Sequence, residues 1–293
     1  MHLHNNKKAN ESSANHRKSK AQKGSNLMEI QSLKLAYFSP TGITKAVVQG
    51  ISRGINQSSV EIIDITRPDA RKKPLQTSEN ELLVIAVPVY MGRVPALLME
   101  WLQAIKAQKT PVVCVVAYGN KVYDDALLEL KNIMTKCGCK PIACAAYIGE
   151  HSFSSSETPT AEGRPDASDL NHAELFGRKI NEKLLSVSSV DHISDINIPG
   201  NYPYGGVTKL WGVDFIAISN ECTQCGICAE GCPVGAIDSE NSALIDTEKC
   251  ITCCACIKNC PQNARTMKTG PVKDAAIRLN KLHKERKEPV FFF

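Results

Sequence analysis

Aromatic residues are scarce in this sequence, at 5% of 293 residues, and no long apolar run occurs. The scarcity argues against a surface on which sugars or single-stranded nucleic acids stack. The longest apolar runs, Leu82–Val89 and Pro111–Tyr118, fall well short of the roughly 18 residues that a membrane-spanning helix needs. The first 27 residues also lack the apolar segment of a secretory signal. We therefore expect a cytoplasmic protein with no membrane span.

The basic excess is confined to the N-terminal tail. The net charge is +5, and residues 1–27 contain six Lys or Arg residues and one Glu, so the remainder of the chain is neutral. The tail is rich in Asn, Ser and His, a composition typical of disorder. We interpret residues 1–27 as a disordered basic tail, or as translated sequence before a true start at Met28. No nucleic-acid partner is expected, and an arm that binds nucleic acid is the alternative.

Cysteines are abundant and unevenly placed. Nine of the 13 lie between Cys222 and Cys260. In a cytosolic chain, clustered cysteines indicate metal or redox chemistry before disulfides. The asymmetry divides the chain into an α/β domain over 28–186, a linker over 187–214, a cysteine-rich domain over 215–270, and a C-terminal helix and tail over 271–293.

Strand and helix patterns alternate in the first domain. Apolar runs predict strands over Leu33–Phe38, Leu82–Val87, Val112–Ala117 and Ile142–Ile148, and the β-branched segment Val60–Ile65 predicts a fifth. Helical periodicity covers Gly42–Ile55, Pro95–Ile105, Tyr123–Thr135, Ala167–Leu185 and, near the C-terminus, Lys273–Arg286. Strands that are apolar throughout and alternate with helices predict a doubly wound parallel sheet covered on both faces. The last helix has an apolar face that could pack on the body, and Phe291–Phe293 has no assigned partner.

Two runs in the cysteine-rich domain share one spacing. The first is Cys222-Thr-Gln-Cys225-Gly-Ile-Cys228-Ala-Glu-Gly-Cys232-Pro233, and the second is Cys250-Ile-Thr-Cys253-Cys-Ala-Cys256-Ile-Lys-Asn-Cys260-Pro261. Both match C-x2-C-x2-C-x3-C-P, the pattern that holds a 4Fe–4S cluster with three thiolates and sends the fourth to a second cluster. All four cysteines repeat at an offset of 28 residues, which indicates an internal duplication.

Crossed ligation then predicts two 4Fe–4S clusters. The first set of ligands is Cys222, Cys225, Cys228 and Cys260, and the second is Cys232, Cys250, Cys253 and Cys256. A structural zinc module is the alternative, although zinc does not require a third cysteine in each run. Cys254 has no counterpart, because Gly226 occupies that position, and we interpret it as a free thiol. Of the other cysteines, we expect Cys114 and Cys144 in the core, and Cys137 and Cys139 in a loop.

Three loops follow predicted strands and carry the residue types of a ligand site. The first contains Ser39, Thr41, Gly42, Ile43 and Thr44; the second Val89, Tyr90, Met91 and Gly92; the third Tyr118, Gly119 and Asn120. Hydroxyls and free amides at a helix N-terminus bind anions, and open α/β sheets bind ligands at the carboxyl ends of their strands. Helix capping explains the first loop equally well, and half-buried packing explains the two tyrosines.

The sequence resembles a known family at these motifs. Ser39–Thr44 is similar to the flavodoxin phosphate loop, and Cys222–Pro261 to a bacterial ferredoxin with two 4Fe–4S clusters. The order resembles the flavodoxin–ferredoxin fusions of anaerobic bacteria, called EFR-type ferrodoxins, as do Pro88–Arg93 and Gly149–Ser152. The resemblance implies a five-stranded flavodoxin-like domain with FMN, followed by a small α+β ferredoxin domain. Gly119-Asn120 departs from the Gly-Asp pair of flavodoxins.

The function predicted is electron transfer through two 4Fe–4S clusters coupled to FMN, with other proteins as redox partners. The alternatives are a flavin-dependent reductase with its own small substrate, and a binding module whose α/β domain has lost FMN. No residue is predicted to be catalytic. His151 is the best candidate for such a role, and a solvated loop histidine is the other interpretation. Arg164 is expected either near the flavin or in an ion pair.

Overall fold

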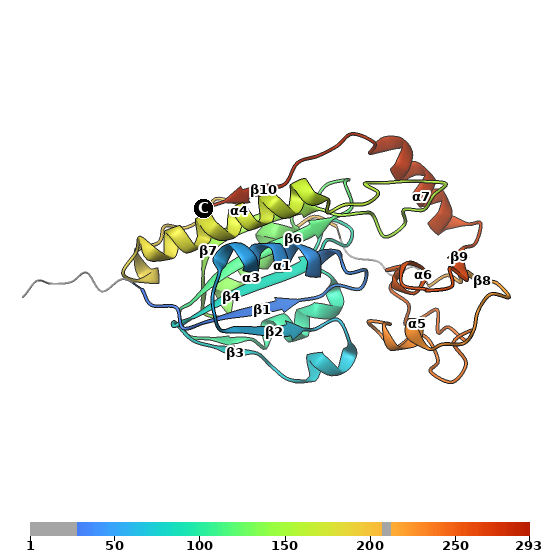
Figure 1. The fold of residues 1–293 in the computed structure, drawn as a ribbon, viewed down its shortest axis with the longest axis horizontal. Helices are drawn as coiled ribbons and strands as arrows, with labels where there is room; N and C mark the ends of the chain where they lie inside the picture. The colour runs from blue at the N-terminus through green and yellow to red at the C-terminus, as the bar shows by residue number, and fades with distance from the viewer. Residues whose placement is uncertain (1–27, 207–211) are drawn as a thin grey trace, which may run out of the picture.

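The computed structural model describes residues 28–206 and 212–293. Figure 1 shows a larger α/β domain with the small cysteine-rich domain at one end. The predicted disordered tail, residues 1–27, lies outside the described residues. No helix in the described ranges is long and apolar enough to cross a membrane.

Six strands form the central sheet, in the order β10-β7-β6-β4-β1-β2. Their bounds are β1 Ser32–Tyr37, β2 Val60–Asp64, β4 Glu81–Pro88, β6 Thr110–Tyr118, β7 Cys139–Ile148 and β10 Val290–Phe292. The first five pair in parallel, and β10 pairs antiparallel with β7. Numbered among themselves, the parallel strands have the order 2-1-3-4-5, which is the flavodoxin-like order. Two-residue strands, β3 Gln76–Thr77 and β5 Lys106–Ala107, pair separately.

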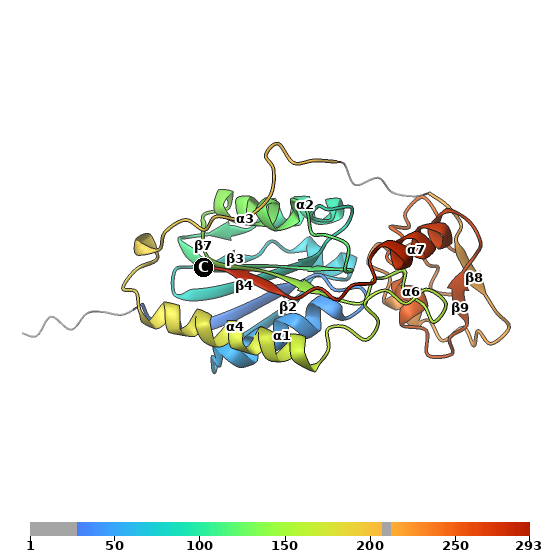
Figure 2. The ribbon, with the colours of Figure 1, turned by 90° about the horizontal axis from the view of Figure 1, so that it is seen from above.

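Helices cover both faces of this sheet, as Figure 2 shows. One face carries α1 Ile43–Ile55 and α4 Ala167–Leu185, and the other carries α2 Met99–Gln103 and α3 Ala126–Lys136. The first two helices cross closely because glycines meet there: a Cβ on Gly177 would lie 2.1 Å from the carbonyl oxygen of Ile51. The helix predicted over 95–105 is shorter than expected, because a 3-10 turn, η2 Ala96–Leu98, replaces its first turn.

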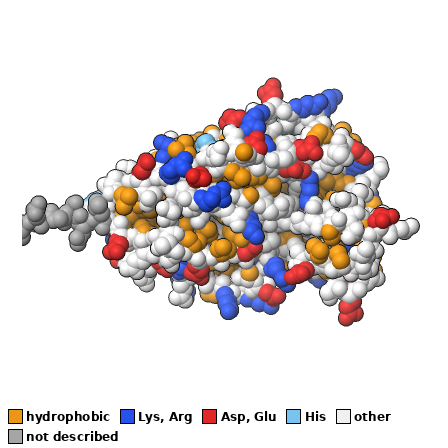
Figure 3. Space-filling view, viewed as in Figure 1, with side chains coloured by type: hydrophobic (Ala, Val, Ile, Leu, Met, Phe, Trp, Pro, Cys, Tyr) orange, Lys and Arg blue, Asp and Glu red, His pale blue; other side chains and the backbone are white. Residues whose placement is uncertain are grey.

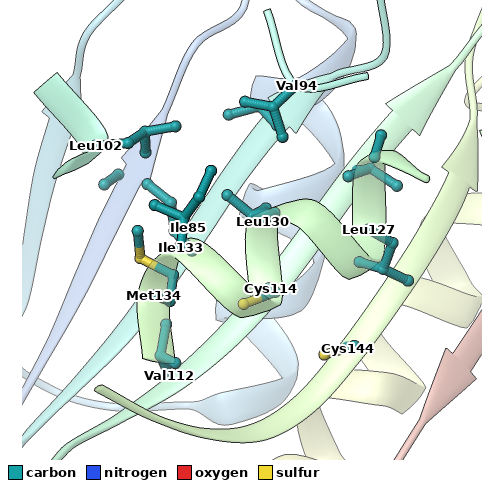
Figure 4. Packing of buried hydrophobic residues seen from close by; sticks show 14 of the residues in the cluster. Ile85, Val94, Leu102, Val112, Cys114, Leu127, Leu130, Ile133, Met134 and Cys144 are labelled. Carbon is teal, nitrogen blue, oxygen red and sulfur yellow. The ribbon is translucent and has the colours of Figure 1, made fainter. Parts of the chain in front are cut away.

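Apolar side chains fill the space between the sheet and α3 (Figure 4). Cys114 and Cys144 are fully buried there, as predicted. Cys139 was expected in a loop, and this is wrong: it begins β7, pairs with Thr110 and is buried. The strand therefore starts three residues before the continuous apolar run.

The small domain contains two structurally similar halves. Its antiparallel pair is β8 Ile216–Ile218 with β9 Arg265–Met267, and its two short helices are α5 Ile227–Glu230 and α6 Ala255–Lys258. Left-handed backbone conformations occur in both repeats at positions related by the 28-residue offset: Gln224 and Thr252, Gly226 and Cys254, Gly235 and Asn263. The sequence duplication is therefore also a structural duplication.

The chain then returns to the larger domain. The helix α7 Pro271–Leu282 ends earlier than the predicted Arg286, and residues 283–293, here called the C-terminal strap, run back across the sheet edge. Phe291, which had no predicted partner, stacks on Phe176 of α4 with ring centroids 5.2 Å apart. The strap ends in β10, a strand that periodicity did not predict.

The polar connections contain short turns. The 3-10 helix η1 Pro68–Lys72 interrupts the polar segment after β2, and η3 Val190–His192 lies in the linker. On the face drawn in Figure 3, acidic and basic side chains are interspersed. This pattern agrees with a chain that is neutral outside its tail.

Candidate functional site

A cavity of about 640 Å³ lies where β4 and β6 end, and it faces the small domain. Ten of the twelve residues predicted to bind the cofactor line it: Ser39, Thr41, Ile43, Thr44, Val89, Tyr90, Met91, Gly92, Tyr118 and Gly119. The three loops therefore meet at one site, as expected for the carboxyl edge of a parallel sheet. Gly42 and Asn120 are not among the lining residues.

The loop before α1 has the geometry of an anion site. Gly42 takes a left-handed conformation, with φ 84°, and ends the loop without a side-chain cap. Ser39 Oγ accepts a hydrogen bond from the N–H of Lys45 at 3.0 Å. The N–H groups of Ile43 and Thr44 belong to the first helical turn, which has no acceptors within the helix. These two residues line the cavity, so a phosphate would find donors there.

Aromatic rings form two other parts of the wall. Tyr90 is half-buried in a tight turn, and burial first, then the thiols of Cys253 and Cys254, raise the pKa of its phenol well above 10. Tyr118 packs edge-on against Tyr123, with centroids 5.5 Å apart. A planar ligand would thus have aromatic neighbours. A second cavity of about 670 Å³ lies beside the linker, and the residues that it shares with the first are Met91, Gly92, Tyr118, Val122 and Asp124.

His151 lies inside the cavity wall and is not a solvated loop histidine. Its Nδ1 accepts a hydrogen bond from the N–H of Phe153 at 3.0 Å, so the neutral ring carries its proton on Nε2. Burial, followed by the charges of Lys258, His283 and Lys121, lowers its pKa to about 4. A Cβ on Gly119 would lie 2.3 Å from the ring, so the glycine makes room for the imidazole.

Asn120 and Arg164 hold the C-terminal strap. The side-chain amide of Asn120 donates to the carbonyl oxygens of His283 and Glu285, at 2.8 and 2.9 Å. Arg164 is buried, forms an ion pair with Asp169 and donates to the carbonyl oxygen of Lys287 at 2.6 Å. Arg164 does not line the cavity, so the ion-pair interpretation is the one that the structure supports. The Oδ1 atom of Asn120 is buried and has no hydrogen-bond partner among the described residues.

The small domain and α7 close the cavity from the other side. Three residues around the second cysteine run line it, Ile251, Thr252 and Cys253. Five residues at α7 do so as well: Ala275, Arg278, Leu279, Leu282 and His283. The domains are held together by polar contacts, in which Lys258 pairs with Glu150 and the Nη2 of Arg71 donates to the carbonyl oxygen of Pro233 at 2.6 Å.

The first predicted set of cluster ligands converges on one small pocket. Cys222, Cys225, Cys228 and Cys260 all line it, together with the buried Arg265. Cys260 comes from the second run, so crossing of the two runs is present in the fold. The Sγ of Cys260 accepts a hydrogen bond from the N–H of Ala264 at 3.3 Å, the kind of bond that stabilises a cluster thiolate.

The second set is also grouped. Cys232 packs with Cys250 and Cys256 in one apolar cluster, which places it beside the second run. Burial raises the pKa of Cys256 to about 12; Arg265 opposes the rise, and the thiols of Cys250, Cys232 and Cys228 add to it. The Sγ of Cys232 accepts from the N–H of Ala236 at 3.2 Å, which matches the bond to Cys260 in the other repeat. Burial also raises the pKa of Cys253, where Cys256 and Cys232 again contribute. These groupings suit two four-thiolate clusters.

Two further observations concern the cysteine-rich domain. Cys254 is buried, 1% exposed, and holds the left-handed position that Gly226 holds in the other repeat. Within 28–206 and 212–293, no three Cys, His, Asp or Glu side chains have the arrangement of ligands to a single metal ion.

Comparison with known proteins bears on the two parts separately. Residues 215–273 match the family model of a 4Fe-4S dicluster domain. Residues 215–273 therefore form an iron–sulfur domain, and such a domain supports a role in electron transfer. No curated protein matches the chain.

Solved structures similar to the chain include several flavodoxins. A flavodoxin from the domain Archaea is 20% identical, with 52% of this chain and 98% of that chain covered and a TM-score of 0.37. A short-chain flavodoxin associated with a PDU bacterial microcompartment is 16% identical, with coverage of 55% and 100% and a TM-score of 0.37. A Fusobacterium nucleatum flavodoxin mutant bound to flavin mononucleotide is 14% identical, with coverage of 56% and 96% and a TM-score of 0.33. The flavodoxin-like fold of the first domain is assigned from its strand order.

Several cavity residues were not predicted from the sequence. The α7 residues and Cys253 come from segments far from the three loops in sequence, and only the tertiary fold brings them to the cavity. The apolar stripe of α7 was a signal that this helix packs on the body, but not a signal of where. Lys121 and Phe153 also line the cavity and were not predicted, although each directly follows a segment that the sequence analysis named.

Proposed function

We propose that this protein transfers electrons between two 4Fe–4S clusters and an FMN bound in the 640 Å³ cavity. One observation carries the proposal: the predicted cofactor loops and Cys253, a predicted cluster ligand, line the same cavity. Bound there, FMN would supply chemistry that accepts one electron or two, whereas each cluster exchanges one.

Each wall of the cavity has its own task in this proposal. The N–H groups of Ile43 and Thr44, with the hydroxyls of the same loop, bind the phosphate. Tyr90 and Tyr118 pack against the flavin ring, and His151 contributes a neutral imidazole ring to the cavity wall. α7 covers the cavity and keeps water from it.

The two ligand sets lie at different distances from the cavity. Cys253 of the second set lines the cavity, and Tyr90 lies close enough to its thiol for the two to interact. The first set surrounds a separate pocket in which Cys225 is exposed. We assign the second set to the cluster nearest the flavin, and the first set to the cluster that meets a redox partner protein in the cytosol.

An anaerobic absorption spectrum with quantified iron, zinc and FMN tests the proposal. We expect about eight iron atoms per chain, together with one FMN released on denaturation. Iron without FMN would favour a module whose α/β domain docks partners. A colourless protein, or one loaded with zinc, would contradict the proposal.

The alternative is a reductase that acts on its own small substrate. It predicts steady oxidation of the chemically reduced protein by small acceptors without a second protein. Electron transfer as proposed predicts rapid exchange only with a partner protein, because α7 and the small domain cover the cavity. Stopped-flow mixing with quinones and with a small ferredoxin separates the two.

A further inference from the structure

Arg265 is a buried cation at one of the two cluster sites. It is 2% exposed and lines the pocket formed by Cys222, Cys225, Cys228 and Cys260. One end of its guanidinium group donates to the carbonyl oxygen of Ser242, but its Nη1 atom has no hydrogen-bond partner among the described residues. A buried, incompletely paired guanidinium group is costly unless a negative charge lies nearby.

The equivalent position at the other cluster site carries no charge. By the 28-residue offset, the position of Arg265 corresponds to Ile237 in the first repeat. Ile237 is buried and packs with the apolar cluster that contains Cys232 and Cys250, two ligands of the second set. The two sites thus have the same backbone plan, with a cation at one and a hydrocarbon side chain at the other.

We propose that Arg265 raises the reduction potential of the cluster held by Cys222, Cys225, Cys228 and Cys260, and makes it the more easily reduced of the two. This inference rests on the proposed function, because it requires both clusters. Reduction adds one electron to the cluster, supplied by a one-electron donor protein, and no bond is made or broken. The added negative charge lies beside the guanidinium group, so the reduced state gains more from the cation than the oxidised state does.

The site also fixes the cation in position. Ser242, which accepts from Arg265, is buried, and its own N–H and hydroxyl donate to the side-chain oxygen of Gln224 at 2.9 and 2.7 Å. Burial keeps the interaction from being screened by salt. The charge of Arg265 also opposes the rise in the pKa of Cys256 of the second set, so the second cluster is expected to shift in the same direction. Because Arg265 lines the pocket of the first set, the larger shift is expected at the first cluster.

An EPR-monitored redox titration of the full-length, cluster-loaded protein tests the proposal. In Arg265→Met, we expect the reduction potential of the cluster held by Cys222, Cys225, Cys228 and Cys260 to fall. At a fixed potential, the ratio of reduced to oxidised cluster should drop about tenfold, which corresponds to ~59 mV for a one-electron couple. The other couple should move less. Arg265→Lys keeps the charge and should restore most of the potential.

Controls separate this effect from general changes. Lys268→Met removes an exposed charge three residues away, and its effect should be small and disappear at high salt. Cys260→Ser should perturb the same couple that Arg265→Met shifts. Equal shifts of both couples, or no shift, would overturn the inference. If Arg265→Met loses iron, the wild-type protein at high salt decides instead: its two couples should stay separated, and two couples with the same potential would overturn the inference.

Failure of the proposed function looks different. In that case the wild-type protein shows fewer than two cluster signals, or no flavin, before any variant is compared. Two clusters with unshifted potentials in Arg265→Met would reject only the role of Arg265.

Discussion

The side-chain amide of Asn259 donates a hydrogen bond to the carbonyl oxygen of Pro40 at 3.1 Å. Asn259 follows the helix that carries Cys256, and Pro40 lies in the loop that leads into α1. One bond therefore joins the cluster-binding domain to the proposed phosphate loop. The orientation of the two domains is set by contacts of this kind.

Lys258 is expected to hold the domains together. It pairs with Glu150 and donates to the carbonyl oxygen of Ser154 at 2.7 Å, with both charged side chains about three-quarters buried. Lys258→Met should weaken the interface by about 1 kcal/mol and speed amide exchange in residues 150–154. Hydrogen exchange measured by mass spectrometry checks this. Lys249→Met, which removes an exposed local ion pair with Asp246, is the matched control and should leave exchange in that loop unchanged.

His151 makes stability depend on pH in a defined window. Its pKa falls from 6.5 to about 4 in the folded protein, so the unfolded chain binds the proton first as the pH drops. The free energy of unfolding is therefore highest above pH 6.5, where the ring is neutral in both states. It decreases as the pH falls to about 4, by up to about 3 kcal/mol. His151→Gln should remove this part of the pH dependence. Urea unfolding of both proteins across this window would show parallel curves if the interpretation were wrong.

The strap should depend on Phe291. Its ring stacks on Phe176 and packs edge-on against Phe293. Phe291 is also the central residue of β10, which pairs with β7. Phe291→Ala is expected to cost about 2 kcal/mol, because the side chain is half-buried. Since the strap anchors α7 over the cavity, FMN should also dissociate faster, which flavin fluorescence measures. Val290→Thr, at a more exposed position of the same strand, serves as the control.

Crossed ligation predicts which cluster each cysteine variant damages. Cys260→Ala should impair the cluster of Cys222, Cys225 and Cys228, although Cys260 lies nearer in sequence to the other set. Cys232→Ala should impair the opposite cluster. EPR of the two variants should therefore show complementary losses, and Cys254→Ala should show both signals. Loss of the sequence-adjacent cluster in Cys260→Ala would contradict the crossed arrangement.

The sheet could be predicted from the sequence because β4, β6 and β7 contain continuous apolar runs, and because helices follow β1, β4, β6 and β7. The cysteine spacing likewise predicted the grouping of Cys260 with the first run, since the duplication constrains the backbone of both repeats. Ligation itself stays a prediction. The three predicted cofactor loops were expected together because the carboxyl ends of parallel strands meet at one edge of the sheet. Ten of the twelve residues predicted to bind the cofactor line the cavity at that edge.

Other features depend on tertiary contacts that leave no periodic signal. Three residues, Val290–Phe292, are too few to show an alternation, and their strand exists because the edge of β7 offers hydrogen bonds. Asn120 was expected at the cofactor, but its amide is used by the carbonyl oxygens of the strap. The approach of α7 to the cavity depends on the path of the same strap, which the sequence does not indicate.

The pairing of β10 with β7 has a consequence for synthesis. The strand β7 is translated long before residues 290–292, so its outer edge stays without a neighbour while the cysteine-rich domain is being made. An exposed strand edge invites pairing with other chains. The nascent protein is therefore most vulnerable to aggregation in the interval before residues 290–292 emerge from the ribosome.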